Sequence, residues 1–222
     1  MQVREQVYIG GDWVAPDATG VIEVISAHSE EVIGQVPDTS PADMDRAVAA
    51  ARDAFDHGPW PRMTPAERAE GITRLSQAIQ ARAQEFADTI SVANGSPKQW
   101  SLMGQVFSAT MVLDTYARIA TEYQFADDRM GALGSPITVL RQPVGVVAGI
   151  IPWNVPLFIA ALKLGPAMAA GCPIVIKPAP ETALDGYLLA EAVAEGKPKA
   201  AATASDRLID YIEDFARKTL DT

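Results

Sequence analysis

Cysteine and histidine are almost missing from this chain, whose 222 residues include one cysteine and two histidines. A single cysteine excludes an internal disulfide framework. The histidines, His28 and His57, stand apart in loop-like contexts and lack the spacing of metal ligands. Positive charge is also scarce, because 18 lysine and arginine residues face 28 acidic ones and leave a net charge of −10. The composition therefore excludes a basic surface for nucleic acid or for an anionic membrane.

Long hydrophobic runs are missing as well. Residues 1–5 have no apolar core of the kind that a signal peptide needs. The longest apolar stretch, residues 155–168, carries Lys163 and is interrupted by Gly165 and Pro166, so we do not expect it to span a membrane. Together with the lone cysteine, these absences predict a protein of the reducing cytoplasm. A hydrophobic content of 48% and a charged content of 21% are typical of a soluble globular protein.

Local signals predict strands first and helices afterwards. Short β-rich stretches between residues 7 and 37 are separated by glycine, proline, aspartate and serine, which indicates strands joined by turns. Three helices are expected next, and each begins at a serine or threonine with an acid or glutamine three residues later. They cover about residues 40–57, 64–93 and 96–123. Residues 131–135 are predicted as a loop and residues 137–141 as a strand.

A β-α-β unit follows, with polar side chains at the ends of both of its strands. The apolar run 144–151 breaks into a turn at residues 152–154, and a helix-length apolar stretch leads to a second apolar run, 173–176, that ends in Lys177. Ligands of open α/β sheets bind beyond the carboxyl ends of the strands. The sequence therefore predicts a binding site formed by this turn and Lys177.

A further helix is expected after the second strand of this unit. Thr182 and Asp185 are predicted to cap it, and it extends to about residue 194. Glu181, Asp185 and Glu191 are interpreted as helix-cap and solvent-face acids.

Several stretches of the chain form a series with a characteristic order and spacing. They are residues 8–11 with Trp13, residues 50–52 with 58–60, residues 65–68, Asn94 and Gly95 with Pro97, and residues 141–146 leading into residues 150–154. Together they resemble the NAD(P)-dependent aldehyde dehydrogenase family, from about residue 8 to about residue 195. The resemblance implies an α/β fold: an incomplete aldehyde-dehydrogenase-like fold with a partial doubly wound dinucleotide-binding sheet plus an N-terminal helical and β region.

The resemblance also suggests how the chain is divided. Residues 1–143 would hold N-terminal strands, helices and an oligomerisation-type strand. Residues 144–195 would form the first β-α-β-α of a dinucleotide-binding domain. Residues 196–222 are expected to be a linker and an amphipathic terminal helix that is unrelated to the family.

By resemblance, Asn154 matches the asparagine whose amide stabilises the oxyanion formed when a thiolate attacks an aldehyde. An asparagine after a strand more often caps the next helix, here the one beginning at Pro156, and Asn154 could do both. Family members use four residues before the asparagine to pack on the nicotinamide-ribose side of the cofactor. The matching residues are Ile150, Ile151, Pro152 and Trp153. Packing within the strand and between strand and helix is the alternative for these side chains.

The resemblance assigns Lys177 to the adenosine ribose of the cofactor, and a lysine that extends to solvent is the alternative. Many family members place a glutamate three positions later to bind both ribose hydroxyls, but here that position is Pro180. Proline cannot accept this hydrogen bond and carries no charge to repel a 2′-phosphate. The choice between NAD and NADP therefore stays open. Lys163 matches a lysine near the substrate channel, or it is a lysine at the edge of its helix.

Three motifs of the family are missing from these 222 residues. They are the Gly-Gln-x-Cys segment of the nucleophile, the Glu-Leu-Gly-Gly segment of the general base, and a Gly-Ser-Thr turn that contacts the cofactor. Cys172 does not replace the nucleophile, because it stands between Gly171 and Pro173 at the entrance of a buried strand. The family oxidises aldehydes to carboxylic acids with NAD or NADP, and we expect this chain alone to be inactive and to bind cofactor weakly.

Three functions remain open at this stage. The chain is an inactive homologue, a non-catalytic subunit that oligomerises with a full-length family member, or one half of a split enzyme. The dinucleotide-binding part has two clear parallel strands, and two strands are rarely stable alone. Open sheet edges favour pairing with another chain. We therefore expect a homo-oligomer or hetero-oligomer, with a small aldehyde as the substrate of the parent family.

Overall fold

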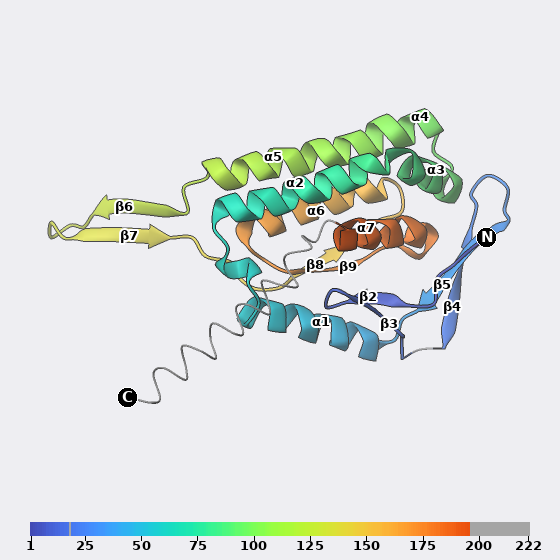
Figure 1. The fold of residues 1–222 in the computed structure, drawn as a ribbon, viewed down its shortest axis with the longest axis horizontal. Coiled ribbons are helices and arrows are strands. Elements are labelled where there is room, and N and C mark those ends of the chain that lie inside the picture. Colours follow the sequence, from blue (N-terminus) through green and yellow to red (C-terminus); the bar gives the residue numbers. More distant parts are fainter. Residues whose placement is uncertain (18, 196–222) are drawn as a thin grey trace.

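The computed structural model describes residues 1–17 and 19–195, and it shows a mixed α/β fold in which helices form the main body (Figure 1). The strands are β1 (Gln2–Val3), β2 (Val7–Ile9), β3 (Asp12–Val14), β4 (Gly20–Ile25), β5 (Val32–Asp38), β6 (Ala126–Met130), β7 (Pro136–Leu140), β8 (Val147–Ile150) and β9 (Ile174–Lys177). The α-helices are α1 (Pro41–Asp56), α2 (Pro65–Ala81), α3 (Ala83–Asn94), α4 (Lys98–Trp100), α5 (Ser108–Glu122), α6 (Pro156–Ala170) and α7 (Ala183–Glu195). Short 3₁₀ turns are η1 (Trp60–Arg62) and η3 (Pro180–Thr182), and η2 (Ser101–Phe107) is a π-helix.

The N-terminal strands form two small sheets, as the β-rich stretches predict. In the first, β4 pairs antiparallel with β5, and β1 pairs parallel with the other edge of β5. In the second, β2 and β3 form a hairpin whose turn residues Gly10 and Gly11 have positive φ angles of 64° and 98°. The hairpin packs on α7 through Trp13, whose ring stacks on Tyr187 with centroids 5.8 Å apart.

The main hydrophobic core lies among the long helices. Helix α2 packs against α5, α5 packs against α6, and α7 contacts both α2 and α3. The largest side chains that are completely buried in this core are Phe86, Ile72, Ile79, Ile90, Leu113, Leu157 and Leu188. Each contributes roughly 1.5–3 kcal/mol through removal of apolar surface from water. The core therefore joins helices from both sides of residue 144 in one packed body.

The helix expected over residues 64–93 is two helices, so that prediction is wrong in its middle. Its start is confirmed, because Thr64 and Glu67 form the predicted capping box. Arg82 interrupts it with backbone angles of −111° and 21°, and α3 begins one residue later. Neither glycine nor proline marks this break in the sequence; the ion pairs of Arg82 accompany it instead.

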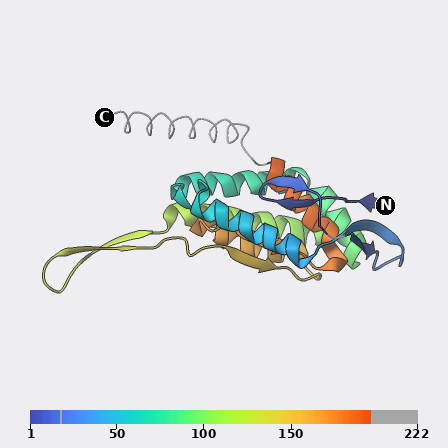
Figure 2. The same cartoon turned by 90° about the horizontal axis from the view of Figure 1, so that it is seen from below.

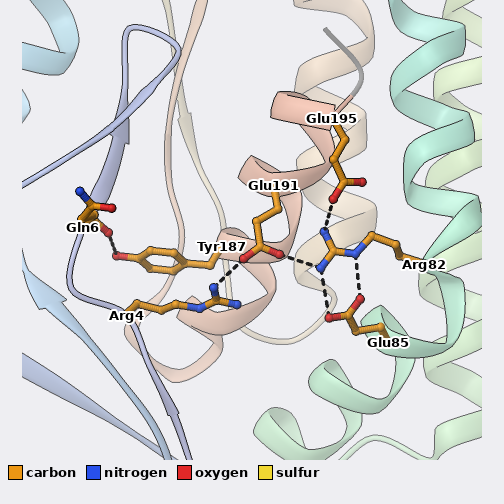
Figure 3. A network of polar contacts seen from close by, with 7 residues as sticks. All are labelled: Arg4, Gln6, Arg82, Glu85, Tyr187, Glu191 and Glu195. Carbon is orange, nitrogen blue, oxygen red and sulfur yellow. Dashed lines mark hydrogen bonds and ion pairs between the residues drawn. The ribbon is translucent and has the colours of Figure 1, made fainter.

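Arg82 is the centre of a polar network that connects three distant parts of the chain (Figure 3). Its guanidinium donates to Glu85 at 2.8 Å, to Glu191 at 2.6 Å and to Glu195 at 3.4 Å. Glu191 also forms an ion pair of 2.6 Å with Arg4, which belongs to the N-terminal segment. The prediction of Glu191 as a solvent-face acid is thus wrong, because its side chain is 22% exposed and bridges two arginines.

The helix expected over residues 96–123 also differs from the prediction. It is composed of α4, the π-helix η2 and α5, in direct succession. The predicted capping box at Ser96 does not form, because the helix begins after Pro97 and no side chain caps it. The Ser96 hydroxyl instead hydrogen-bonds to Asn94 at 2.7 Å and to Ser101 at 2.7 Å.

Strands β6 and β7 form a hairpin that extends away from the helical body in both views (Figures 1 and 2). The pairing runs from Ala126 opposite Leu140 to Met130 opposite Pro136. The loop at residues 131–135 and the second strand are confirmed, whereas the first strand was not predicted. The sequence of β6 shows little alternation of polar and apolar residues, because both faces of the hairpin are largely exposed.

The β-α-β unit is confirmed, with β8 and β9 paired in parallel and connected by α6. Helix α6 runs uninterrupted through Pro166 and ends at Gly171, whose φ of 83° is left-handed. Among the helices that the structure describes, none combines the length and the apolar character that a membrane span requires.

Candidate functional site

The candidate site lies where β8 and β9 end side by side. The parallel register places Ile150 opposite Lys177, and the Ile151 amide donates to the Lys177 carbonyl at 3.0 Å. Both strands therefore finish at the same edge of the sheet. The structure brings the turn of residues 152–154 next to Lys177, as the strand ends predict.

Side chains alternate between core and solvent along the end of β8. Ile151 is 3% exposed and belongs to the main core, while Ile150 is 71% exposed on the opposite face. Trp153 is 54% exposed, and Pro152 beside it is also exposed. An apolar surface made by Ile150, Pro152 and Trp153 is therefore accessible beyond the strand, whereas Ile151 supports it from within.

Asn154 does not cap helix α6, so that alternative interpretation is wrong. The N-cap residue is Val155, with backbone angles of −138° and 61°, and no side chain caps the helix. Asn154 is exposed, and in the described part of the chain no hydrogen bond engages its side-chain amide. The amide is therefore available as a donor to a ligand.

Lys177 extends into solvent from the end of β9, with its ammonium 3.4 Å from the Pro178 carbonyl oxygen. Pro180 is exposed at the start of the 3₁₀ turn η3, and Glu181 beside it is exposed too. Lys163 is half-buried on α6. A lysine and an uncharged, exposed proline thus follow the strand in the order that the sequence predicts.

Asp185 differs from its predicted place on the solvent face. It lies in the first turn of α7, as a capping residue would, but it is only 5% exposed. Burial raises the pKa of its carboxyl group to about 8, although backbone amides of Asp185 and Gly186 counteract this. One carboxyl oxygen and the hydroxyl of the fully buried Thr182 have no hydrogen-bond partner among the described residues.

Cys172 is 4% exposed, which agrees with its interpretation as a structural residue. Its backbone amide donates to the Ala167 carbonyl at 2.9 Å and so helps to end α6. Within residues 1–17 and 19–195, no group of three or more histidine, cysteine, aspartate or glutamate side chains could hold a metal ion.

Asn94 contacts the candidate site, a role that the sequence does not indicate. Its side-chain amide donates to the carbonyl oxygens of Trp153 at 3.3 Å and Asn154 at 3.1 Å. Gly95 ends α3 with a left-handed φ of 77°. No local signal could reveal a contact between residues about sixty positions apart.

A surface groove between α2 and α5 lies outside this site. Small side chains alternate with charged ones along it; they include Ala69, Thr73, Arg74, Ala117 and Arg118. None of the residues that line it belongs to the turn, to β8 or to β9. The groove therefore does not bear on the chemistry at the strand ends.

Comparison with known proteins identifies similar sequences and structures. The protein-family model described as the aldehyde dehydrogenase family matches residues 13–204. Geranial dehydrogenase of Castellaniella defragrans is 41% identical over 194 residues, which are 86% of this chain and 40% of that protein. Aldehyde dehydrogenase 1 of Tanacetum cinerariifolium is 36% identical over 83% of this chain and 37% of its own length.

A solved structure agrees with these sequence relatives. The Mycobacterium tuberculosis aldehyde dehydrogenase complexed with NAD⁺ superposes with a TM-score of 0.85 and 39% identity, over 89% of this chain and 41% of that chain. The chain thus spans about two fifths of the length of these relatives, and the matching portion is their N-terminal one.

Proposed function

This chain belongs to the aldehyde dehydrogenase family, and we propose that it supplies one wall of an NAD(P) pocket and the oxyanion donor of an aldehyde-oxidising site. The described fold is a partial aldehyde dehydrogenase fold. The nucleophile and the general base would come from sequence outside these 222 residues, because the family's cysteine and glutamate motifs are missing here.

The observation that carries this proposal is the convergence at the ends of β8 and β9. The register of Ile150 opposite Lys177 places an exposed apolar surface, an amide donor and a cation at one edge of the sheet. A dinucleotide has matching parts: a flat ring, a ribose and charged phosphates. Ligands of α/β sheets bind at this edge.

Each exposed residue at the strand ends would have a distinct role in binding or catalysis. The Asn154 amide would donate to the aldehyde oxygen as it gains negative charge, a contact that typically contributes about 3 kcal/mol. Ile150 and Trp153 would pack against the cofactor, and Lys177 would donate to a ribose hydroxyl. The nicotinamide cofactor, when bound, accepts a hydride from the substrate.

The proposal leaves both cofactors possible. Pro180, at the position where many family members place a ribose-binding glutamate, is exposed and has neither charge nor a side-chain acceptor. It would therefore neither bind the two ribose hydroxyls nor repel a 2′-phosphate. Similar affinity for NAD and NADP is the expected consequence.

Association with another chain is the second proposal, and exposed apolar residues favour it. Val144, which precedes β8, is 91% exposed, and Ile150, the last residue of β8, is 71% exposed. The β6–β7 hairpin exposes Ile137 and Leu140 as well, by 50% and 60%. These surfaces fit a homo-oligomer, a full-length relative or a complementary half of a split enzyme.

Titration with NAD and NADP tests the first proposal. We expect millimolar binding that quenches tryptophan fluorescence, and loss of the quenching in Trp153→Phe. Lys177→Ala should weaken binding, while Arg118→Ala, which removes an exposed cation on α5, should not. Equal weakening by both variants would show that general charge, and not the strand-end lysine, attracts the cofactor.

Light scattering tests the second proposal. We expect an oligomer whose mass falls when Ile137 and Leu140 are both replaced by aspartate, since charges on the hairpin oppose its pairing. A monomer at all concentrations would contradict self-association. Failure of a full-length relative to bind as well would contradict the hetero-oligomer.

A further inference from the structure

We propose that Asn94 is a positioning residue that holds the Trp153–Asn154 turn through a one-way relay of hydrogen bonds from the π-helix η2. The turn's part in cofactor and oxyanion binding rests on the function proposed above. Whether Asn94 holds the turn is a separate question, which the free chain can answer.

The orientation of the Asn94 amide is fixed by its neighbours. The Ser96 backbone amide donates to the Asn94 side-chain oxygen at 3.0 Å, and the Ser96 hydroxyl donates to the same oxygen at 2.7 Å. An amide turned the other way would place two N–H groups against donors. The nitrogen therefore faces the turn, where it donates to the carbonyl oxygens of Trp153 and Asn154 at 3.3 and 3.1 Å.

The relay continues into the protein interior. The Ser96 hydroxyl lies 2.7 Å from the Ser101 hydroxyl and 3.5 Å from the Gln105 amide nitrogen. Because the Ser96 proton is used toward Asn94, Ser101 and Gln105 are the donors in these two contacts. All donors thus point in one direction, from the buried helix to the exposed turn.

Burial makes the inner end of this relay rigid. Ser101 and Gln105 are both 0% exposed, and both belong to the π-helix. Buried polar groups are held strongly because losing a partner exposes them to an apolar surrounding. A π-helix inside a longer helix often occurs at functional sites. Here its wider turn accompanies two polar side chains that are directed toward Ser96.

The outer end of the relay is the part that needs support. Residues 152–154 are exposed, and Val155, which follows, starts α6 without a side-chain cap. Fixing the carbonyls of Trp153 and Asn154 also fixes the peptide planes from which both side chains project. We therefore assign to Asn94 the orientation of the residues that would contact the cofactor and the aldehyde oxygen.

Hydrogen exchange in the unliganded chain tests this inference. Asn94→Asp keeps the oxygen that accepts from Ser96 and replaces the donor by a second oxygen facing two carbonyls. We expect exchange of the Ile159 amide, whose donation to the Val155 carbonyl at 3.1 Å closes the first turn of α6, to become about tenfold faster, as for the loss of one net hydrogen bond or more. Asn94→Ala should act in the same direction. Thr73→Ala is the matched control, since it removes a 2.9 Å side-chain bond to the Ala69 carbonyl on α2, outside the relay.

Two results would overturn the inference. Unchanged exchange of the Ile159 amide in Asn94→Asp would show that the turn holds itself. Acceleration that is equally large in peptides of α2 and α5, or at Ile159 in Thr73→Ala, would show that Asn94 stabilises the domain and does not position the turn. A failure of NAD titration in the unaltered chain would refute the proposed function while leaving the exchange result intact.

Discussion

Replacing the buried carboxyl group of Asp185 by an amide should remove the decrease in the free energy of unfolding that this group causes as the pH rises. In the folded chain burial raises the pKa of Asp185 from 3.8 to about 8. Between these values the folded state retains a proton that the unfolded state has lost. Stability from this group is thus complete below about pH 4, decreases as the pH rises through 8, and is lost above it.

The size of the effect follows from the shift and the burial of the side chain. About four pKa units at about 1.4 kcal/mol each set an upper bound of about 6 kcal/mol. Relaxation and water penetration reduce such values in real proteins, so we expect about 2–4 kcal/mol. The side chain is 5% exposed, which makes solvent screening small.

Urea denaturation between pH 4.5 and pH 9 measures this dependence. The free energy of unfolding of Asp185→Asn should equal that of the unaltered chain near pH 4.5 and exceed it by about 2–4 kcal/mol at pH 9, because the amide is neutral throughout. Asp114→Asn, at an exposed position on α5, is the control and should follow the unaltered chain. Parallel curves for Asp185→Asn and the unaltered chain, within about 0.5 kcal/mol at every pH, would refute the reasoning.

Three further predictions concern activity and stability. The 222-residue chain should not reduce NAD or NADP with simple aldehydes; steady NADH formation that Asn154→Ala abolishes and Cys172→Ser leaves intact would contradict this. Arg82→Met should lower the free energy of unfolding by about 2 kcal/mol, because Glu85 and Glu195 lose this cation and partly buried Glu191 keeps only Arg4, and full stability in a melting experiment would count against the network. Gly171→Ala should lower it by about 1–2 kcal/mol, since φ is 83° and the new Cβ would lie 2.9 Å from Pro143 Cγ; an unchanged melting temperature would be the contrary result.

Local signals predicted the features whose causes are local. Thr64 and Glu67 lie three residues apart, and their capping box formed as expected. The strand-end placement of Lys177 was also predictable, because parallel strands necessarily end at the same edge of a sheet. Such features depend on chain geometry over a few residues or on one pairing rule.

Features that depend on distant partners could not be predicted. The break at Arg82 accompanies ion pairs with acids of α7, more than one hundred positions away. Asp185 looked like a surface acid because nothing in its neighbourhood reveals that β4 and α3 cover the turn before it. The Asn-Gly pair at residues 94 and 95 is typical of a helix end, and nothing near it in the sequence indicates that Asn94 contacts the candidate site.

The Asn94-Gly95 pair also makes this protein susceptible to slow deamidation of Asn94. In an Asn-Gly sequence the glycine nitrogen attacks the asparagine side chain with little steric hindrance, and ammonia leaves as the side chain becomes an acid. Here that nitrogen donates to the Ser91 carbonyl at 3.0 Å, and the side-chain amide is engaged at both ends. The reaction therefore requires local opening of the end of α3. Deamidation to aspartate would place a carboxylate against the carbonyls of the turn. The fraction of molecules with a loosened candidate site should therefore increase as a preparation ages.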